Sequence, residues 1–286
     1  HHGDGTQDIY WHDPDTLFIS LHQDGRTLFP GSGFCDEIGG PNAAGTTLNI
    51  PLPPYTSEEG FMKVINKVVQ TVLEDFSPDM IINSAGQDNH FTDPLTNMNF
   101  SAKGYADLTA LLKPDIAVLE GGYSIETALP YVNVGIILAM AGMDYSNVTE
   151  PEYSAERLRQ GPRITETIEK KCQEVLSGWK NRHDTQKSMQ KYKSYDERSR
   201  NIFYDTDGFF ESQHETIRIC NECGGTYKID SSSDSGFRVL AVHIPRKACS
   251  KCKKTGYKWF EKTGMGTYDM ILLQDRPEDN YIIRKK

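Results

Sequence analysis

Four cysteines in the C-terminal third of the chain have the spacing of a metal site. They form two CxxC pairs, Cys220 with Cys223 and Cys249 with Cys252, and 25 residues separate the pairs. The segments GGTYKI and FRVLAVHIP between them have the composition of strands, and a hairpin would bring the two pairs together. Four thiolates at the corners of a tetrahedron are the usual coordination of structural Zn2+. The spacing therefore predicts a four-cysteine zinc ribbon.

Four segments of the N-terminal half carry residues that could share one site. They are HHGDGTQD at 1–8, PGSGFCDEIG at 30–39, SAGQDNHFTDPL at 84–95 and LEGGYS at 119–124. Each alone has an ordinary structural explanation, because histidine pairs pack in cores, glycine-rich segments turn and an aspartate after a strand caps a helix. Together they offer imidazole and carboxylate, a partial Zn2+ ligand set, and a Gly-Gly turn that lets the backbone approach a substrate.

Short apolar runs in the first 145 residues predict the strands that would position these residues. Their nearly continuous apolar character is typical of a parallel sheet covered on both faces. The runs are TLFISL at 16–21, LNIPL at 48–52, MIINS at 80–84 and IAVLE at 116–120.

Helical patterns separate these strands. Apolar residues recur at helical spacing over 61–76, and Ser101 and Ser124 can cap helices that run to about 112 and 140. The alternation predicts an α/β fold with a doubly wound, mostly parallel sheet, in which ligands bind at the carboxyl ends of the strands. The residues that fall at such ends are Asp88, Gly121, Gly122 and Tyr123.

The charge distribution divides the chain. Residues 1–150 carry 20 acidic and 5 basic side chains, a balance of −15, whereas the remaining residues carry 20 acidic and 26 basic, a balance of +6. Such a split favours two units with different surroundings. We expect a catalytic-type α/β part over 1–150, a helical extension and linker over 151–202, and the small β-rich zinc-ribbon module over 203–286.

Six motifs of the N-terminal part also carry a family resemblance. HHGDGTQ, SLH at 20–22, FPGSG at 29–33, NIPLP at 49–53, SAGxDxHxxDPL and LEGGY follow one another in the chain. Over roughly residues 1–145 the sequence resembles the histone deacetylase and acetylpolyamine amidohydrolase superfamily. The resemblance implies the C-terminal part of an arginase/deacetylase-like domain and zinc-dependent hydrolysis of an N-acetyl amide, with Zn2+ as Lewis acid. The implied substrate is an acetylated amine, either acetyl-lysine in protein or a small acetylpolyamine.

The resemblance also implies roles for individual residues. His1 and Asp88 resemble two ligands of the catalytic zinc. Tyr123 resembles the catalytic tyrosine whose hydroxyl stabilises the oxyanion. The resemblance further implies a structural monovalent-cation site, usually potassium, at Ser20 and Leu21. The residues that would contact the substrate are Phe29, Gly121 and Gly122.

Two family features lie outside these residues. The family has an aspartate two positions before the ligand histidine, which would precede His1, and a tandem catalytic His-His pair further upstream. The GDGTQ that follows His1 and His2 marks them as the ligand segment. We therefore expect this chain to supply part of an active site, completed by the N-terminal part of the catalytic domain. The alternative is a catalytically incomplete protein whose zinc ribbon binds protein or nucleic acid.

Partners and compartment follow from composition. Basic residues alternate with Tyr257, Trp259 and Phe260 around the second cysteine pair, a pattern that could bind nucleic acid; a solvated face beside a small core is the favoured explanation. No run of eighteen apolar residues exists, so no membrane association is expected. Paired CxxC spacing indicates a reducing compartment, the cytoplasm or, in a eukaryote, alternatively the nucleus.

Overall fold

The computed structural model describes residues 1–204 and 206–286, and the chain divides into two compact units. Unit 1 comprises His1–Ile9, Leu17–Ile38 and Thr47–Asn181. Unit 2 comprises Tyr10–Thr16, Gly39–Thr46 and Arg182–Lys286. The second unit therefore combines the C-terminal part of the chain with two short segments from the N-terminal part.

All four predicted strands of the N-terminal part form, and they pair in parallel as expected. β1 (Phe18–Gln23) pairs with β2 (Thr47–Leu52), and β3 (Ile82–Ala85) pairs with β4 (Ile116–Leu119). Every residue of β2 is buried, which explains its continuous apolar run. The α/β class and the parallel pairing are confirmed, and the described strands form two two-stranded ladders.

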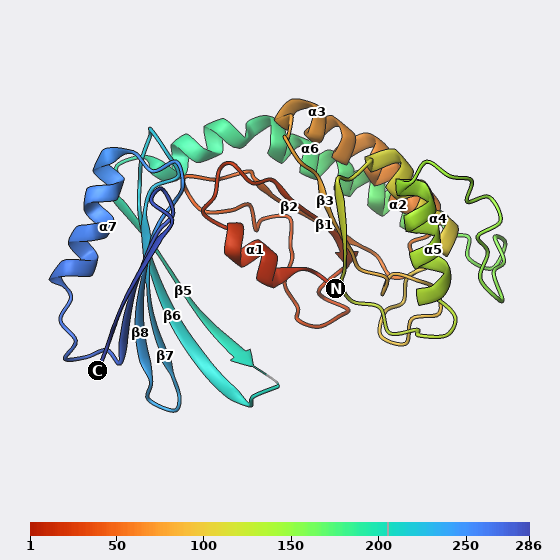
Figure 1. The fold of residues 1–286 in the computed structure, drawn as a ribbon. Coiled ribbons are helices and arrows are strands. Elements are labelled where there is room, and N and C mark those ends of the chain that lie inside the picture. The colour runs from red at the N-terminus through yellow and green to blue at the C-terminus, as the bar shows by residue number, and fades with distance from the viewer. Residues whose placement is uncertain (205) are drawn as a thin grey trace. The chain divides into compact units, whose positions relative to one another are not determined.

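Helices fill the connections from β2 to β3 and from β3 to β4, whereas residues 24–46 between β1 and β2 form turns (Figure 1). The predicted helix at 61–76 is one continuous helical stretch with a π-helical centre. Ser101 caps α4 as predicted, because its side chain accepts a hydrogen bond from the N–H of Gly104. Ser124 does not cap α5, which begins later, at Leu129. The helices of unit 1 are α1 (Asp4–Tyr10, its last residue in unit 2), α2 (Glu58–Val64), η1 (Ile65–Val69), α3 (Gln70–Phe76), α4 (Ala102–Leu112) and α5 (Leu129–Met140).

One apolar core joins the elements of unit 1. Phe61 stacks on Phe100 with ring centroids 4.5 Å apart, and Phe100 meets Tyr105 edge-to-face. Helix α6 (Pro162–Gln190) adds Ile168 and Trp179 to the same core. This helix lies within the predicted helical extension over 151–202, and its polar end continues to Gln190.

Unit 2 is built on a six-stranded sheet of order β10-β9-β8-β7-β6-β5. The sheet begins at Tyr195, before the Phe203 at which the sequence suggested a start. All neighbouring strands are antiparallel except β8 and β9, which are parallel and joined through α7 (Ser250–Lys262). The strands are β5 (Tyr195–Tyr204), β6 (Phe209–Arg218), β7 (Tyr227–Ser233), β8 (Arg238–Ile244), β9 (Met270–Asp275) and β10 (Asn280–Lys285).

A small second core lies between α7 and the β8–β9 part of the sheet. Its buried members are Leu240, Val242, Ile244, Phe260, Ile271 and Leu273. A Cβ on Gly256 of α7 would lie 2.6 Å from the side chain of Ile244, so the helix packs closely because that position has no side chain. So few buried apolar side chains stabilise a unit weakly by themselves.

Candidate active site and metal centre

The predicted zinc ligands His1 and Asp88 lie side by side in unit 1. Nδ1 of His1 is 3.0 Å from Oδ1 of Asp88, and both side chains are buried. Asp88 follows β3, so the end of a parallel strand delivers its carboxylate as the sequence predicted. Burial raises the pKa of Asp88, because the charged carboxylate loses water. A nearby cation would stabilise the ionised form.

The unpaired atoms of this pair fit a metal. Although Nδ1 of His1 lies close to Asp88, neither that nitrogen nor Oδ2 of Asp88 has a hydrogen-bond partner among the described residues. Buried polar atoms are nearly always paired, and a metal held by this histidine and aspartate would satisfy both atoms. The backbone N–H of Gln23 donates to Nε2 of His1 at 2.8 Å. Zinc at Nδ1 would place the ring proton on Nε2, so this contact has to lengthen in the metal-bound protein.

Tyr123 reaches the same place from the Gly-Gly turn after β4. A Cβ built on Gly121 would lie 2.5 Å from Oδ2 of Asp88 and 3.5 Å from the Tyr123 hydroxyl. Gly121 is therefore required, because any side chain there would collide with the carboxylate. Gly122 has φ +143°, a conformation that favours glycine. The structure thus brings His1, Asp88, Gly121 and Tyr123 together.

A polar network that the sequence did not reveal ties the Asp88 loop to the Tyr123 turn. Oδ2 of Asp93 accepts the N–H of Tyr123 at 2.9 Å. The hydroxyls of Thr92 and Ser124 are 2.7 Å apart. Because these bonds link the loop after β3 to the loop after β4, the hydroxyl of Tyr123 and the carboxylate of Asp88 are positioned by one network.

His90 and Glu150 form a second buried support of the Asp88 loop. Nε2 of His90 is 3.0 Å from Oε1 of Glu150, and both side chains are inaccessible to solvent. The same carboxylate oxygen accepts the N–H of Ala102 at the start of α4. Burial alone would raise the pKa of Glu150, but the bonds from His90 and Ala102 outweigh it, and the pKa of Glu150 is lowered.

Removal of this carboxylate should destabilise the protein strongly. We expect Glu150→Ala to lower the free energy of unfolding by about 3–5 kcal/mol, because a buried pair loses one partner, and the exposed control Glu156→Ala to have little effect. Chemical denaturation measures both. Because the pKa of Glu150 is lowered by folding, the pair contributes fully to the free energy of unfolding at pH values above the ordinary glutamate pKa of about 4.3. This contribution is lost as the pH falls through the pKa of Glu150 in the folded protein. Equal stability of the two variants would show that the pair is dispensable.

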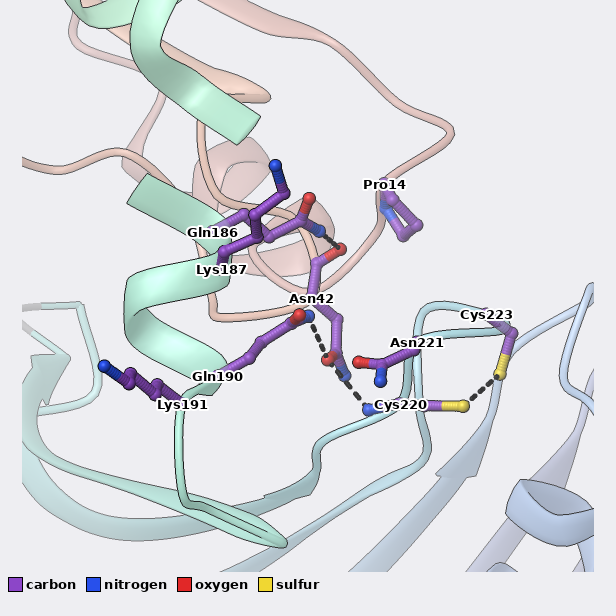
Figure 2. Close-up of a pocket in the computed structure, with 9 residues that line it drawn as sticks. All are labelled: Pro14, Asn42, Gln186, Lys187, Gln190, Lys191, Cys220, Asn221 and Cys223. Atoms are coloured by element: carbon purple, nitrogen blue, oxygen red, sulfur yellow. Dashed lines mark hydrogen bonds between the residues drawn. The ribbon is translucent and has the colours of Figure 1, made fainter. Parts of the chain in front are cut away.

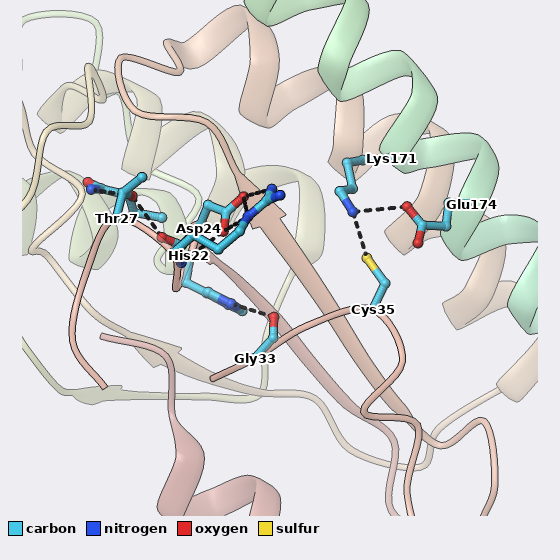
Figure 3. A network of polar contacts seen from close by, with 9 residues as sticks. His22, Asp24, Thr27, Gly33, Cys35, Lys171 and Glu174 are labelled. Atoms are coloured by element: carbon cyan, nitrogen blue, oxygen red, sulfur yellow. Dashed lines mark hydrogen bonds and ion pairs between the residues drawn. The ribbon is translucent and has the colours of Figure 1, made fainter. Parts of the chain in front are cut away.

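Ser20, one of the two residues predicted to hold a monovalent cation, is buried, and its hydroxyl lies between His2 and His22. Burial, together with the neighbouring His2, lowers the pKa of His22 to about 4, so the ring is neutral at pH 7. Its Nε2 then donates to the carbonyl of Gly33 at 3.0 Å, and its Nδ1 is an acceptor (Figure 3). Oγ of Ser20 lies 2.9 Å from that Nδ1 and 2.6 Å from the carbonyl oxygen of His2.

The Ser20 hydroxyl has one proton for these two acceptors. That proton goes to the carbonyl oxygen of His2, to which the hydroxyl donates. Leu21 lies next in β1 and pairs with Ile50 of β2. A monovalent-cation site at Ser20 and Leu21 stays a prediction.

Phe29 is the most exposed of the predicted substrate residues. Its side chain is 83% accessible, and the turn that carries it is closed by the N–H of Gly31, which donates to the carbonyl of Leu28 at 3.2 Å. Gly121 faces Asp88, and Gly122 faces Gln87. Contact of Phe29, Gly121 and Gly122 with a substrate stays a prediction.

The four cysteines of unit 2 converge as the spacing predicted. Their sulfur atoms all lie within 4.8 Å of one another, and all six cysteines of the chain are free thiols. Cys220 Sγ is 3.8 Å from Cys249 Sγ and 3.7 Å from Cys223 Sγ. A tetrahedron with Zn–S bonds of 2.3 Å has edges of about 3.8 Å. The cluster therefore has the dimensions of a zinc tetrathiolate site.

Backbone amides and one cation face these sulfurs. The N–H groups of Glu222 and Gly225 donate to Cys220 and Cys223, each at 3.4 Å. Although burial opposes it, the amide of Glu222 and the neighbouring thiols lower the pKa of Cys220 to about 7. Nη1 of Arg218 lies 2.8 Å from Cys252 Sγ. Four thiolates around one Zn2+ carry a net negative charge, which these donors would stabilise.

The second cysteine pair stands at the start of a helix. Cys249 is the N-cap of α7 and Cys252 lies in its first turn. The β7–β8 hairpin between the pairs is confirmed.

Basic side chains of α7 form ion pairs with carboxylates: Lys251 contacts Glu222 and Lys253 contacts Glu278. Phe260 is buried in the second core. These contacts favour a solvated, ion-paired face.

Comparisons with known proteins agree with this geometry. Residues 1–135 match the sequence profile of the histone deacetylase domain. This match covers 135 of the 286 residues. A probable deacetylase of Archaeoglobus fulgidus is 51% identical over 161 residues, which cover 53% of this chain and 44% of that protein. The acetoin utilization protein AcuC of Bacillus subtilis is 34% identical over 171 residues, which cover 57% of this chain and 44% of that protein.

Solved structures show the same fold. The HD domain of HDA15 has a TM-score of 0.54 and 25% identity, covering 66% of this chain and 51% of that one. The histone deacetylase Clr3 has a TM-score of 0.55 and 25% identity, and the match covers 64% of this chain and 31% of that one. The histone deacetylase type of α/β fold is thus confirmed. The chain spans less than half the length of the curated relatives named above. None of the helices in the described residues combines the length and apolar character needed to cross a bilayer.

Proposed function

We propose that the intact protein hydrolyses N-acetyl amides, with acetyl-lysine or acetylpolyamine as substrate. One observation carries the proposal: the unpaired Nδ1 of His1 lies 3.0 Å from Asp88, beside the hydroxyl of Tyr123. A zinc ion held there would polarise the acetyl carbonyl and activate water. His1 and Asp88 would hold it as two of its ligands, and the remaining ligand and the catalytic histidines would come from the N-terminal part of the domain.

The chain's own residues then act on the substrate. The Tyr123 hydroxyl donates a hydrogen bond to the acetyl oxygen as negative charge develops on it. Asp93 fixes the backbone of Tyr123, which keeps that donor in place. The side-chain-free surface of Gly121 and Gly122 leaves room for the acetyl group, and the ring of Phe29 contacts the methylenes of the acylated amine.

Exposed apolar strands support a larger catalytic domain. Ile82 in β3 and Ile116 in β4 are 57% and 43% accessible, and Leu119 is 71% accessible. Parallel strands are almost always covered on both faces. We infer that further polypeptide, the N-terminal part of this domain, covers β3 and β4 in the intact protein.

Acetate release tests the proposed activity. We expect the intact protein to release acetate from an acetyl-lysine peptide or an acetylpolyamine, to stop after chelation and to recover with added zinc. The polypeptide of residues 1–286 alone should be several orders of magnitude slower, because a catalytic base and a ligand are supplied elsewhere.

Two results would contradict this picture. Normal turnover by residues 1–286 alone would show that the missing groups are not needed. An intact protein that binds zinc at His1 and Asp88 but releases no acetate from either substrate would refute the proposed reaction. The alternative, a catalytically incomplete protein with a binding module, would then be favoured.

A further inference from the structure

The side chain of Asn42 spans the loop that carries the first cysteine pair. Its Nδ2 donates to the carbonyl oxygens of Arg218 at 2.8 Å and Gly224 at 3.0 Å. Its Oδ1 accepts the N–H of Cys220 at 3.1 Å (Figure 2). Arg218 and Gly224 flank Cys220 and Cys223, so one amide group joins the two ends of this loop. Asn42 is only 2% exposed.

Asn42 is itself held by the last turns of α6. Gln186 donates to its carbonyl oxygen at 2.9 Å, and Gln190 donates to its Oδ1 at 3.2 Å (Figure 2). A Cβ on Gly225 would lie 2.4 Å from the Asn42 amide nitrogen, so the loop leaves no room for a side chain there. Hydrogen bonds and close packing both fix the amide group against the loop.

A second set of contacts holds the segment Tyr10–Thr16 to the same sheet. Nε2 of His12 is 3.2 Å from Oε2 of Glu215, and both residues are buried. The guanidinium of Arg198 lies 4.3 Å from the ring centre of Trp11. The N–H of Gly40 donates to the carbonyl of Trp11 at 2.7 Å. Both short segments of the histone deacetylase domain are therefore integral parts of unit 2.

We infer that Asn42 is a positioning residue of the four-cysteine metal site, and that metal bound there fixes Gly39–Thr46 of the histone deacetylase domain. The shared loop makes the two effects reciprocal: if Asn42 favours the metal-binding conformation, metal binding favours the bonded conformation of Asn42 by the same free energy. On this inference the metal fixes the segment Gly39–Thr46 within unit 2. The inference does not require the proposed hydrolysis.

Zinc affinity in the 286-residue chain tests the first half. We expect Asn42→Ala to bind zinc at the cysteines about 10- to 100-fold more weakly, the usual effect of losing a residue that orients metal ligands. Asn221→Ala is the matched control, because Asn221 is an exposed asparagine between Cys220 and Cys223. Competition with a chromophoric chelator gives the affinity, and the thiolate absorption of bound Co2+ shows that four sulfurs still bind.

Hydrogen exchange in the unaltered chain tests the second half. We expect the amides of Gly39–Thr46 to exchange faster when zinc is removed, while amides of α4 in unit 1 keep their protection. Because the exchange measurement uses the unaltered chain, it tests the inference even if Asn42→Ala does not fold. Equal zinc affinity of Asn42→Ala and Asn221→Ala, or unchanged exchange of Gly39–Thr46 without zinc, would overturn the inference. Neither measurement depends on acetyl hydrolysis, so failure of this inference can be distinguished from failure of the proposed function.

Discussion

Replacing Tyr123 with phenylalanine in the intact protein is expected to slow acetyl hydrolysis by about 10²–10³-fold, the usual effect of losing one oxyanion donor. The ring and the backbone bond to Asp93 remain, so the turn keeps its conformation. Zinc content should not change, because the tyrosine hydroxyl is not a ligand. Single-turnover rates and metal analysis of the same preparation measure the two quantities. Tyr192→Phe, at a 94% exposed tyrosine, is the control.

Asp88→Asn provides the contrast that assigns the roles. It replaces an anionic ligand with a neutral one, so activity should fall together with zinc content at this site. Raising the zinc concentration should restore part of the activity of Asp88→Asn and none of that lost in Tyr123→Phe. Equal metal loss in both variants, or full activity of either, would show that the roles of these two residues are misassigned.

The proximity of Asp88 and Tyr123 was predictable because both follow strand ends, whereas the place of His1 followed from the family resemblance alone. Apolar runs located β3 and β4 within two residues, and the two strands pair in parallel. The loops after their carboxyl ends therefore meet at one edge. The four-cysteine cluster was predictable for a similar reason, since the spacing within each pair and the hairpin between the pairs are local features.

The supporting residues were not predictable, because their partners are remote and unpatterned. Glu150 lies 60 residues after His90, and a single glutamate in a polar segment gives no periodic signal. Asn42 is 176 residues from Arg218, whose carbonyl it bonds. The helix at the second cysteine pair did leave a signal: Cys252, Gly256 and Phe260, all buried, recur every four residues.

Removal of zinc from the four cysteines is expected to unfold unit 2, the largest stability effect in the chain. Structural zinc contributes about 10–16 kcal/mol of apparent binding free energy in small zinc domains, whereas whole domains are stable by about 5–15 kcal/mol. The second core has six buried apolar residues, too few to replace that contribution. We expect Cys249→Ser to lose the zinc and to lower the thermal midpoint as much as a chelator does.

The measurement should count only the zinc of this site. Metal content and thermal unfolding are therefore compared in the 286-residue chain carrying Asp88→Asn, which weakens the other site. Cys35→Ser is the control, because Cys35 is a partly buried thiol that contacts Lys171 and lies in unit 1. One zinc per chain should remain in that control and none in Cys249→Ser. Unit 2 remaining folded without metal would mean that its sheet, together with the bonds of His12 and Asn42, suffices without the tetrathiolate site.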